Sequence, residues 1–417
     1  MSFENRLQSI NKLIKHCRKA SFYRERMPAK PIDSLAEFKK IPLITKEDLR
    51  NNSPYGLVCV PQKKLYEYHE SFGTTGSPIS SWLTKEDLHL HMKNINSGGL
   101  EFTKNDIVLI RFPYALSLIA HIVHPAVQAK GACVIPASSR TTVTPFTRTI
   151  NLMQKLKVTI FAGLPLQALL LAETAELMGL NPAQDFPHLR AIFSAGEPLT
   201  RGKRQLLESI WRVPITDNFG MTEIGSGITN CQFGRHHIPE DEFIFEILAD
   251  DLQTEVEPGS IGSLVITTLK KKGTPVIRYL TGDRAKIVPE KCPCGEEYSF
   301  EHHGRSSDVL KIDNRVLDCW DLSDIISHLP CQRFWVAGPK ADGVKFIVEE
   351  EKSGDSVTQD LINALEVKCN LKIEIEIVPK GTLYDRNGLF TVAEVGKPRY
   401  IFTSREMEQK AYLTANI

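Results

Sequence analysis

Between residues 105 and 216 the chain alternates β-rich runs with segments at helical spacing. The β-rich runs are NDIVLIRF (105–112), GACVIPA (131–137), VTIFAG (158–163) and HLRAIFSAG (188–196). The helical segments are SLIAHIVHPAVQAK (117–130), RTINLMQKLK (148–157) and PLQALLLAETAELMG (165–179), followed by a helix and a short strand, PIT, within 201–216. Strands that alternate with helices in this way favour a parallel sheet that is covered on both faces.

The pattern changes on either side of this region. Residues 1–70 are expected to be helical and polar. After Phe243, short β-rich runs predict a small barrel or distorted sheet: FIFEILAD (243–250), SLVITTL (263–269), PVIRYLTGD (275–283) and RAKIVP (284–289). From residue 304 onward an α+β pattern has the size of a small independent domain. We therefore expect an α/β protein with a large N-terminal domain, 1–303, and a small C-terminal α+β domain, 304–417.

The charge balance and the cysteines constrain the partners and the compartment. With 51 Lys and Arg against 50 Asp and Glu, the net charge is +1, so we expect neither nucleic acid nor a membrane as a partner. No run approaches the length of a transmembrane helix, and the start, MSFENRLQSINKLIKHC, predicts an amphipathic helix, not a secretory signal. Nine cysteines then favour metal or catalytic thiols in a reducing, cytoplasmic setting over disulfides.

The stretch 71-SFGTTGSPISSW-82 predicts a flexible loop with accessible backbone. Gly73 and Gly76 let the main chain approach a ligand closely. Thr74 and Thr75 add hydroxyl donors, so the loop suits an anion such as phosphate. A plain hairpin turn is the alternative, because Gly, Ser and Pro are the commonest turn residues. The stretch is not a Walker A loop, because no Lys-Ser or Lys-Thr follows its second glycine.

Four further segments are expected at strand ends or turns, where ligands bind in open α/β sheets. They are FSAGEPLT (193–200), DNFGMTE (217–223), YLTGD (279–283) and HGRSSD (303–308). Each one alone has an ordinary explanation as a turn, a helix start or a surface loop. Their order along the chain, after the glycine loop, is much more specific than any single segment.

This order of motifs resembles the adenylate-forming enzymes, which include acyl- and aryl-CoA ligases and the adenylation domains of peptide synthetases. Within them the chain looks most like the phenylacetate-CoA ligase-like branch. The segments 22-FYRERM-27 and 41-IPLITKEDLR-50 resemble that branch's opening helices, and HIPEDEFIFEIL (237–248) and CPCG (292–295) resemble its later segments. The resemblance covers nearly the whole chain, and it implies a large adenylate-forming domain followed by a mobile C-terminal domain.

The resemblance also implies which residues bind Mg·ATP. Those on the pyrophosphate side are Thr74, Thr75 and Gly76. Those around the adenine are Ser194, Ala195, Gly196, Glu197 and Pro198, with Phe219 stacked on the purine and Asn218 and Gly220 near its amine. Thr222 would donate to the α-phosphate and Glu223 would bind Mg²⁺, a hard cation that prefers carboxylate oxygen. Asp283 would accept from the ribose hydroxyls, and Arg305 would reach the ribose or phosphates.

The chain departs from the family pattern at three positions and matches a fourth. Phe72 replaces a common serine, Ile79 stands where many relatives have lysine or threonine, and Ser307 where an acidic hinge residue is frequent. These changes predict weaker phosphate binding and an altered hinge. Lys397, in 394-EVGKPRY-400, matches the C-terminal lysine that would neutralise charge between the substrate carboxylate and the α-phosphate. A lysine near the C-terminus by chance is the alternative.

A metal site is the further implication of the resemblance. The branch often carries a cysteine, a histidine before isoleucine and a C-x-C, which here are Cys231, His237, Cys292 and Cys294. His237 is preferred to His236 because it precedes Ile238. Three thiolates and one imidazole make a closed structural zinc site. The alternative is four unrelated residues, with CPCG as a knuckle turn.

The implied activity is a two-step ligation. A carboxylate attacks the α-phosphorus of ATP, and a thiol, from coenzyme A or a carrier-protein pantetheine, then displaces AMP. The acid is expected to be aryl or otherwise compact, in a mostly apolar pocket with Phe112, Tyr114, His121 and Leu164 as candidates. Loading of an acyl carrier protein and a nucleotide-binding regulatory protein without catalysis remain as alternatives, and a homodimer is an open assembly state.

Overall fold

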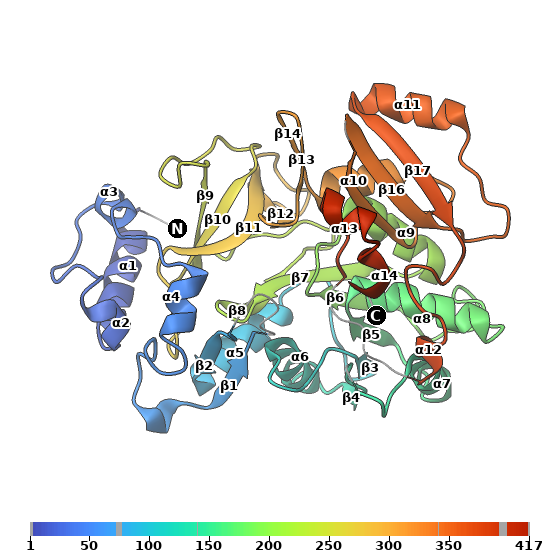
Figure 1. The fold of residues 1–417 in the computed structure, drawn as a ribbon. Helices are drawn as coiled ribbons and strands as arrows, with labels where there is room; N and C mark the ends of the chain where they lie inside the picture. Colours follow the sequence, from blue (N-terminus) through green and yellow to red (C-terminus); the bar gives the residue numbers. More distant parts are fainter. Residues whose placement is uncertain (1–2, 72–76, 140, 341, 392–397, 416–417) are drawn as a thin grey trace. The chain divides into compact units, whose positions relative to one another are not determined.

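The computed structural model describes residues 3–71, 77–139, 141–340, 342–391 and 398–415 (Figure 1). The chain forms two compact units, each built from several stretches of sequence. Unit 1 contains Met1–Asn105, Phe112–Cys133 and Thr216–His302. Unit 2 contains Asp106–Arg111, Val134–Ile215 and His303–Ile417. This division does not test the predicted domain boundary at residue 304, which stays a prediction.

Unit 1 holds a helical start and most of the antiparallel strands. Its helices are α1 (Phe3–Cys17), α2 (Ser21–Arg24), α3 (Leu35–Lys39), α4 (Lys46–Asn51), the 3-10 turn η1 (Gln62–Lys64), α5 (Lys85–Ile95) and α6 (Leu118–Gln128). Its strands are β1 (Glu67–Glu70), β2 (Ser80–Leu83), β7 (Ile215–Met221), β8 (Gly225–Thr229), β9 (Phe243–Leu248), β10 (Gly262–Thr268), β11 (Tyr279–Val288) and β12 (Ser299–Arg305).

One sheet of unit 1 has the antiparallel order β12-β11-β10-β9, and its apolar side chains join a core that reaches from Ile10 to Phe300. Strands β7 and β8 form an antiparallel pair, and α5 and α6 pack against β8 (Figure 1). Helix α5 begins in a capping box: the Thr84 hydroxyl accepts from the Asp87 amide while the Asp87 carboxylate accepts from the Thr84 amide.

The glycine-rich stretch connects two paired strands. Strands β1 and β2 are antiparallel, with Glu70 opposite Ser80. The pairing continues to Ser71, whose amide donates to the carbonyl oxygen of Ile79 at 2.9 Å while its hydroxyl accepts from the Ile79 amide at 2.9 Å. The strand pairing thus extends to Ser71 and Ile79, and residues 72–76 between them lie outside the described residues, so both interpretations of this stretch stay predictions.

Unit 2 holds the parallel strands and the C-terminal α+β segment. Its strands are β3 (Ile107–Ile110), β4 (Cys133–Pro136), β5 (Ile160–Gly163), β6 (Ala191–Ala195), β13 (Leu310–Ile312), β14 (Arg315–Leu317), β15 (Trp335–Lys340), β16 (Gly343–Glu349) and β17 (Lys372–Val378). Its helices are α7 (Phe146–Lys155), α8 (Pro165–Leu177), α9 (Arg201–Trp211), α10 (Cys319–Ile326), α11 (Gln359–Cys369), α12 (Gly388–Thr391), α13 (Ser404–Glu408) and α14 (Tyr412–Ala415).

The strands of unit 2 that precede residue 200 are adjacent in the order β4-β3-β5-β6, and the β3–β5 and β5–β6 pairs are parallel. This confirms the parallel sheet predicted from the alternation. Helix α8 is buried from Pro165 to Ala175 on every side, as expected of an almost wholly apolar sequence. In the C-terminal segment, β15, β16 and β17 form a mixed sheet with α10 and α11.

Three expectations about the elements are wrong. Residues 1–70 include strand β1, which pairs with β2, a strand that lies beyond residue 70 on the other side of the glycine-rich stretch. The segment 217–223 mostly continues strand β7 instead of following a short strand. The two strands expected over 275–289 are one strand, β11, because Gly282 does not turn the chain there.

The motifs DNFGMTE (217–223) and YLTGD (279–283) both lie at irregularities in strand pairing. The register of β7 against β8 shifts between Phe219 and Gly220. Gly282, with φ of +77°, lies in β11 opposite a register shift between Ser263 and Val265. At Gly282 glycine permits the positive φ, and bulges bend a strand and redirect its side chains. The glycines therefore mark bulges, where sequence reasoning expected turns.

Candidate functional site

Glu223 lies in the tight turn between β7 and β8. Glu223 is 7% exposed, and its Oε1 accepts a hydrogen bond from the Tyr279 hydroxyl at 2.9 Å. Its backbone carbonyl oxygen accepts from Lys271 Nζ at 2.7 Å. Burial lowers the pKa of Lys271 to about 8, against the opposing charges of Asp87 and Glu223. The half-buried Thr222 stands beside it in the same turn.

Asp283 is brought together with two aromatic rings. Its residue is 3% exposed, and its Oδ2 lies 3.2 Å from His302 Nε2. The ring of His302 is 5.0 Å from the ring of Phe219, centroid to centroid. The backbone of Asp283 is held as well, because its amide donates a hydrogen bond to the Thr281 hydroxyl at 3.0 Å. The ribose candidate and the purine-stacking candidate therefore lie within one cluster of side chains.

A single strand connects the Glu223 turn with this cluster. Tyr279, Thr281, Asp283 and Ala285 are the buried positions of β11, and they alternate with more exposed ones. The burial pattern continues across the bulge at Gly282. Tyr279 contacts Glu223, and Asp283 contacts His302. Strand β11 of unit 1 therefore contacts one acidic candidate and contributes the other.

The remaining candidates on β7 are engaged by the protein itself. The Asn218 side chain donates to Ser226 Oγ at 2.6 Å and accepts from the Thr229 hydroxyl at 3.0 Å. Phe219 is 7% exposed and packs edge-on against Phe300 at 5.1 Å. Gly220 has no room for a side chain, because a Cβ would lie 2.8 Å from the carbonyl oxygen of Gly225. Their expected roles around the adenine stay predictions.

Unit 2 carries the other nucleotide candidates at the end of β6. Ser194 and Ala195 are buried in the strand, and Gly196 ends it with φ of +92°. Leu164, expected in the acid pocket, lies beside Gly196: a Cβ on that glycine would be 3.8 Å from Leu164 Cγ. Gly304, which precedes Arg305, lies beside Pro198: a Cβ on Gly304 would be 3.7 Å from Pro198 Cγ. Arg305 follows at the end of β12.

Glu197 is the centre of a buried polar cluster in unit 2. Its side chain is 4% exposed, and its Oε1 accepts from the Leu166 amide at 2.5 Å. Its Oε2 accepts from Tyr400 at 3.2 Å and lies 3.4 Å from Lys203 Nζ, which donates to the Tyr400 hydroxyl at 2.6 Å. Burial and then the charge of Glu197 raise the pKa of Tyr400 well above its usual value, so it stays a phenol.

The other acid-pocket candidates lie in unit 1. Phe112 is 1% exposed, whereas Tyr114 and His121 are half-buried. His121 Nε2 is 2.8 Å from the carbonyl oxygen of Tyr114, and the hydroxyl of Tyr114 is 3.0 Å from His124 Nδ1. Burial raises the pKa of Tyr114 to about 12. The structure thus joins Tyr114, His121 and His124 in one hydrogen-bonded group.

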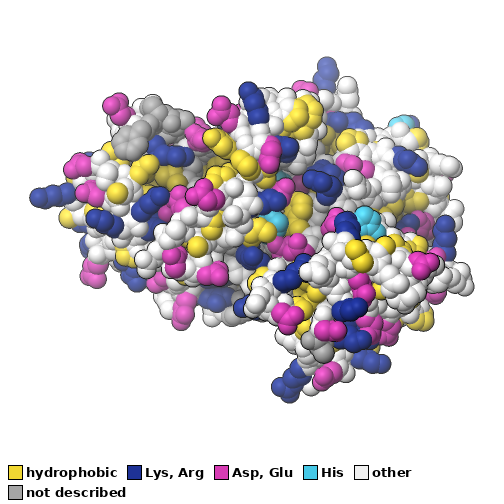
Figure 2. Space-filling view, turned by 90° about the horizontal axis from the view of Figure 1, so that it is seen from above, with side chains coloured by type: hydrophobic (Ala, Val, Ile, Leu, Met, Phe, Trp, Pro, Cys, Tyr) yellow, Lys and Arg dark blue, Asp and Glu magenta, His cyan; other side chains and the backbone are white. Residues whose placement is uncertain are grey.

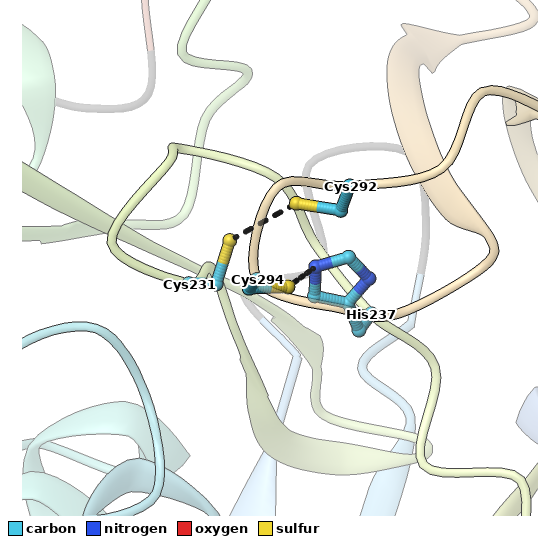
Figure 3. Close-up of side chains that lie close together, drawn as sticks. All are labelled: Cys231, His237, Cys292 and Cys294. Carbon is cyan, nitrogen blue, oxygen red and sulfur yellow. Dashed lines mark hydrogen bonds between the residues drawn. The ribbon is translucent and has the colours of Figure 1, made fainter.

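Cys231, His237, Cys292 and Cys294 converge, with all their potential ligand atoms within 4.8 Å of one another (Figure 3). The Cys231 and Cys292 sulfurs are 3.7 Å apart, and Cys294 Sγ is 3.2 Å from His237 Nε2. Two thiolates bound at about 2.3 Å to a tetrahedral zinc ion are about 3.8 Å apart. The chemistry and the spacing of these donors therefore fit a zinc ion.

Hydrogen bonds around these four residues support the same set of donors. His237 Nδ1 lies 2.7 Å from the carbonyl oxygen of Tyr298, which fixes Nδ1 as the protonated nitrogen and turns Nε2 toward the thiols. The amides of Gly234 and Gly295 each donate to the carbonyl oxygen of a cluster cysteine, at 2.9 Å, and so form tight turns around the thiols. His236 is elsewhere, 3.3 Å from Asp217, which agrees with the preference for His237.

Some candidates fall outside the described residues, and others were missed. Thr74, Thr75, Gly76, Phe72 and Lys397 lie in the parts that the structure does not describe. Sequence reasoning missed Tyr279 and Lys271 on the Glu223 turn, and Lys203 and Tyr400 on Glu197. A polar residue next to a recognised motif, as in YLTGD and GKPRY, was a signal for the two tyrosines; none distinguished the lysines.

On the face seen in Figure 2, basic and acidic side chains are interspersed, in keeping with the near-balance of charges. Among the described residues, no helix is both long and apolar enough to cross a membrane.

Comparisons with known proteins agree with this architecture. Residues 71–270 match the family model described as AMP-binding enzyme. Phenylacetate-coenzyme A ligase of Thermus thermophilus is 30% identical over 304 residues, 70% of this chain and 67% of that protein. The enzyme of the same name from Aromatoleum evansii is 31% identical over 325 residues, 76% of this chain and 72% of that protein.

A solved structure, 2-hydroxyisobutyryl-CoA ligase in the postadenylation state, matches with a TM-score of 0.84 at 19% identity, over 99% of this chain and 92% of that chain. The chain therefore belongs to the AMP-binding enzymes, the adenylate-forming family that its motif order resembles. Within that family it belongs with the phenylacetate-CoA ligase relatives, whose class is the AMP-forming acid–CoA ligases.

Proposed function

We propose that this enzyme activates an aryl or other compact carboxylic acid as its acyl adenylate and transfers the acyl group to coenzyme A. The observation that supports the nucleotide site most directly is the common strand β11. Its Tyr279 engages the Mg²⁺ candidate Glu223, and its Asp283 pairs with His302 beside Phe219. Glu223 and Asp283, which are 60 residues apart in sequence, thereby both belong to the surroundings of β11.

The proposed chemistry follows from what these groups can do. A carboxylate oxygen of the acid bonds to the α-phosphorus of ATP, and the bond to the pyrophosphate oxygen breaks. Glu223 would hold Mg²⁺, whose charge favours the phosphate oxygens, and Thr222 would donate to the α-phosphate. Asp283 would fix the ribose, so that the enzyme acts mainly by positioning. Attack of the coenzyme A thiol on the acyl carbon then releases AMP.

The candidates for binding the acid are Phe112, Tyr114 and His121 in unit 1 and, separately, Leu164 in unit 2. The relatives carry the name phenylacetate-CoA ligase, and the structural neighbour acts on 2-hydroxyisobutyrate by its name; both are compact acids. The Tyr114 phenol bonds to His124, and the His121 imidazole bonds to the Tyr114 carbonyl oxygen, so these side chains would offer a pocket only a few polar contacts. The names of the relatives favour coenzyme A over a carrier protein as the acceptor.

We further infer a structural zinc ion on Cys231, His237, Cys292 and Cys294. Four protein donors close the coordination shell, so the ion would supply stability and no chemistry to the reaction. It would tie the segment after β8 to the segment between β11 and β12. The large N-terminal domain, the small mobile C-terminal domain from residue 304 and the role of Lys397 in adenylation complete the proposal.

Acid-dependent exchange of labelled pyrophosphate into ATP tests the proposal. The panel contains phenylacetate, benzoate, 2-hydroxyisobutyrate and a long-chain fatty acid as the negative control. We expect exchange with one or more compact acids and formation of the corresponding thioester with coenzyme A. Exchange without thioester formation would point to a carrier-protein acceptor. ATP binding with no exchange for any acid would contradict the proposed enzyme and favour a regulatory nucleotide-binding protein.

A further inference from the structure

Lys271 is a buried lysine whose ammonium group has two neutral acceptors. The residue is 2% exposed, whereas its neighbour Lys272 is exposed. Nζ donates to Ser81 Oγ at 2.9 Å and to the carbonyl oxygen of Glu223 at 2.7 Å. Lysine is almost never fully buried unless it is paired, and a buried charge is weak evidence for a gain in stability. A role beyond packing is therefore the question that this side chain raises.

The two acceptors belong to the two segments that are proposed to handle the phosphates of ATP. Ser81 lies on β2, the strand that leaves the glycine-rich connection. Glu223 lies in the β7–β8 turn as the Mg²⁺ candidate. The ammonium group is thus a bridge between a strand and a turn that are more than 140 residues apart in sequence.

The backbone that carries Lys271 is clamped in place. The Asp87 carboxylate accepts from the amides of Lys272 at 2.6 Å and of Gly273 at 2.9 Å, while it also caps α5. A Cβ on Gly273 would lie 2.1 Å from the carbonyl oxygen of Trp82, so the chain passes β2 in direct contact. The ammonium group therefore projects from a fixed point.

The Glu223 turn is held from two other directions. The Tyr279 hydroxyl bonds to the carboxylate at 2.9 Å. On the α5 side, Gly225 has φ of +95°, and a Cβ there would lie 2.1 Å from the ring of His91. The bond from Lys271 supplies a charge-assisted donor to the carbonyl oxygen of Glu223, which the other two contacts do not provide. Asp87 and His91 are the other ionisable groups near the ammonium.

We propose that Lys271 is a positioning residue, which sets the Glu223 carboxylate at a fixed distance from the strand leaving the phosphate-binding loop and so supports Mg²⁺-dependent ATP binding. Without the ammonium group, the Glu223 carbonyl loses its donor and the turn relaxes. The Glu223 carboxylate then occupies the position that binds Mg²⁺ for a smaller fraction of the time. This inference rests on the proposed function, in which Glu223 holds Mg²⁺.

The test is calorimetric titration of the full-length chain with ATP, in Mg²⁺ and in EDTA at equal ionic strength. In Lys271→Met we expect the tightening of ATP binding by Mg²⁺ to fall about tenfold, the size of one charge-assisted hydrogen bond, with Mg²⁺-free affinity within about twofold of wild type. The matched control Lys272→Met, an exposed lysine one residue on, should behave as wild type. A general structural role would weaken ATP binding equally in both buffers.

The variant Glu223→Gln distinguishes a failure of this inference from a failure of the proposed role of Glu223. If Glu223→Gln loses the Mg²⁺ effect and Lys271→Met keeps it, the inference is overturned and the proposed function stands. If both variants keep it, the proposed role of Glu223 fails, and the inference fails with it.

A second measurement applies even if Lys271→Met does not fold. Ser81→Ala removes one of the two acceptors with little change in volume. We expect faster amide hydrogen exchange in peptides that cover residues 219–226 of this variant, with wild-type exchange in peptides from α1. Unchanged exchange over 219–226 would overturn the proposed bridge.

Discussion

Replacing Glu173 by glutamine perturbs a buried charge cluster in unit 2. Glu173 lies on α8 with its side chain 2% exposed. Three cations from the C-terminal segment contact it: Lys380 Nζ at 2.5 Å, Arg386 Nε at 3.2 Å and Arg333 Nη1 at 3.3 Å. Glutamine preserves the shape of the side chain and removes its charge, so the substitution isolates the electrostatic contribution.

The contacts that remain set the expected magnitude. Removing one partner of a buried ion pair costs roughly 3–5 kcal/mol. Here Arg386 keeps Glu349 at 2.5 Å, and Arg333 keeps Glu176 at 2.7 Å. Lys380 is 34% exposed, so water can take over part of its solvation. We therefore expect a smaller loss, about 2–3 kcal/mol of unfolding free energy at pH 7.

The sign of the pH dependence follows from the shift in pKa. Burial by itself raises the pKa of Glu173, but the hydrogen bond from Lys380 and the charges of Arg386, Lys380 and Arg333 together lower it below 4.5. A carboxyl with a lowered pKa in the folded state stabilises the fold above its unfolded pKa and loses that contribution as pH falls through the folded value. The difference between wild type and Glu173→Gln should thus shrink below about pH 4.5.

Thermal unfolding at pH 7 and at low pH measures both effects. At roughly 2.1 cal/mol/K per residue, the expected loss lowers the Tm by about 3 °C if all 417 residues unfold together, and by more if unit 2 unfolds separately. Glu176→Gln, on the same helix but 34% exposed, is the matched control and should cost less than about 1 kcal/mol. A Glu173→Gln protein as stable as wild type at pH 7, or one with the same deficit at low pH, would refute the reasoning.

Three further outcomes are expected. Metal analysis after dialysis should give about one zinc ion per chain, and Cys292→Ser should lower both this content and the Tm; a stoichiometry near zero in wild type removes the site. Asp283→Asn should weaken ATP binding roughly 10- to 100-fold and abolish the preference for ATP over 2′-deoxy-ATP, whereas a preserved preference would exclude Asp283 from the ribose. Lys397→Ala should slow acid-dependent pyrophosphate exchange far more than it weakens ATP binding, and equal exchange rates would point to a different lysine.

The local sequence was sufficient for the regular elements and for the family. The alternation over 105–200 predicted the parallel strands β3, β5 and β6, because a strand buried on both faces and a covering helix each leave a periodic signature. The ordered motifs indicated the adenylate-forming family. The family resemblance, in which a histidine precedes isoleucine, favoured His237 over His236, and the structure brings His237 to the three thiols.

Tertiary structure decided what local patterns leave ambiguous. Gly220 and Gly282 have the composition of turns, but both lie at bulges within strands because their partners β8 and β10 supply the pairing. Local sequence contains no information about a partner strand, so a glycine that permits positive φ predicts either outcome equally.

The three consecutive lysines at 270–272 make the same point for the site. Lys270 forms an ion pair with Asp241, Lys272 is exposed, and Lys271 is buried against Ser81 and Glu223. Side chains of identical chemistry differ here in burial because β2 and the β7–β8 turn supply acceptors to Lys271 alone of the three. The sequence determined which residue types are present; long-range packing decided which ammonium group reaches the proposed Mg²⁺ site.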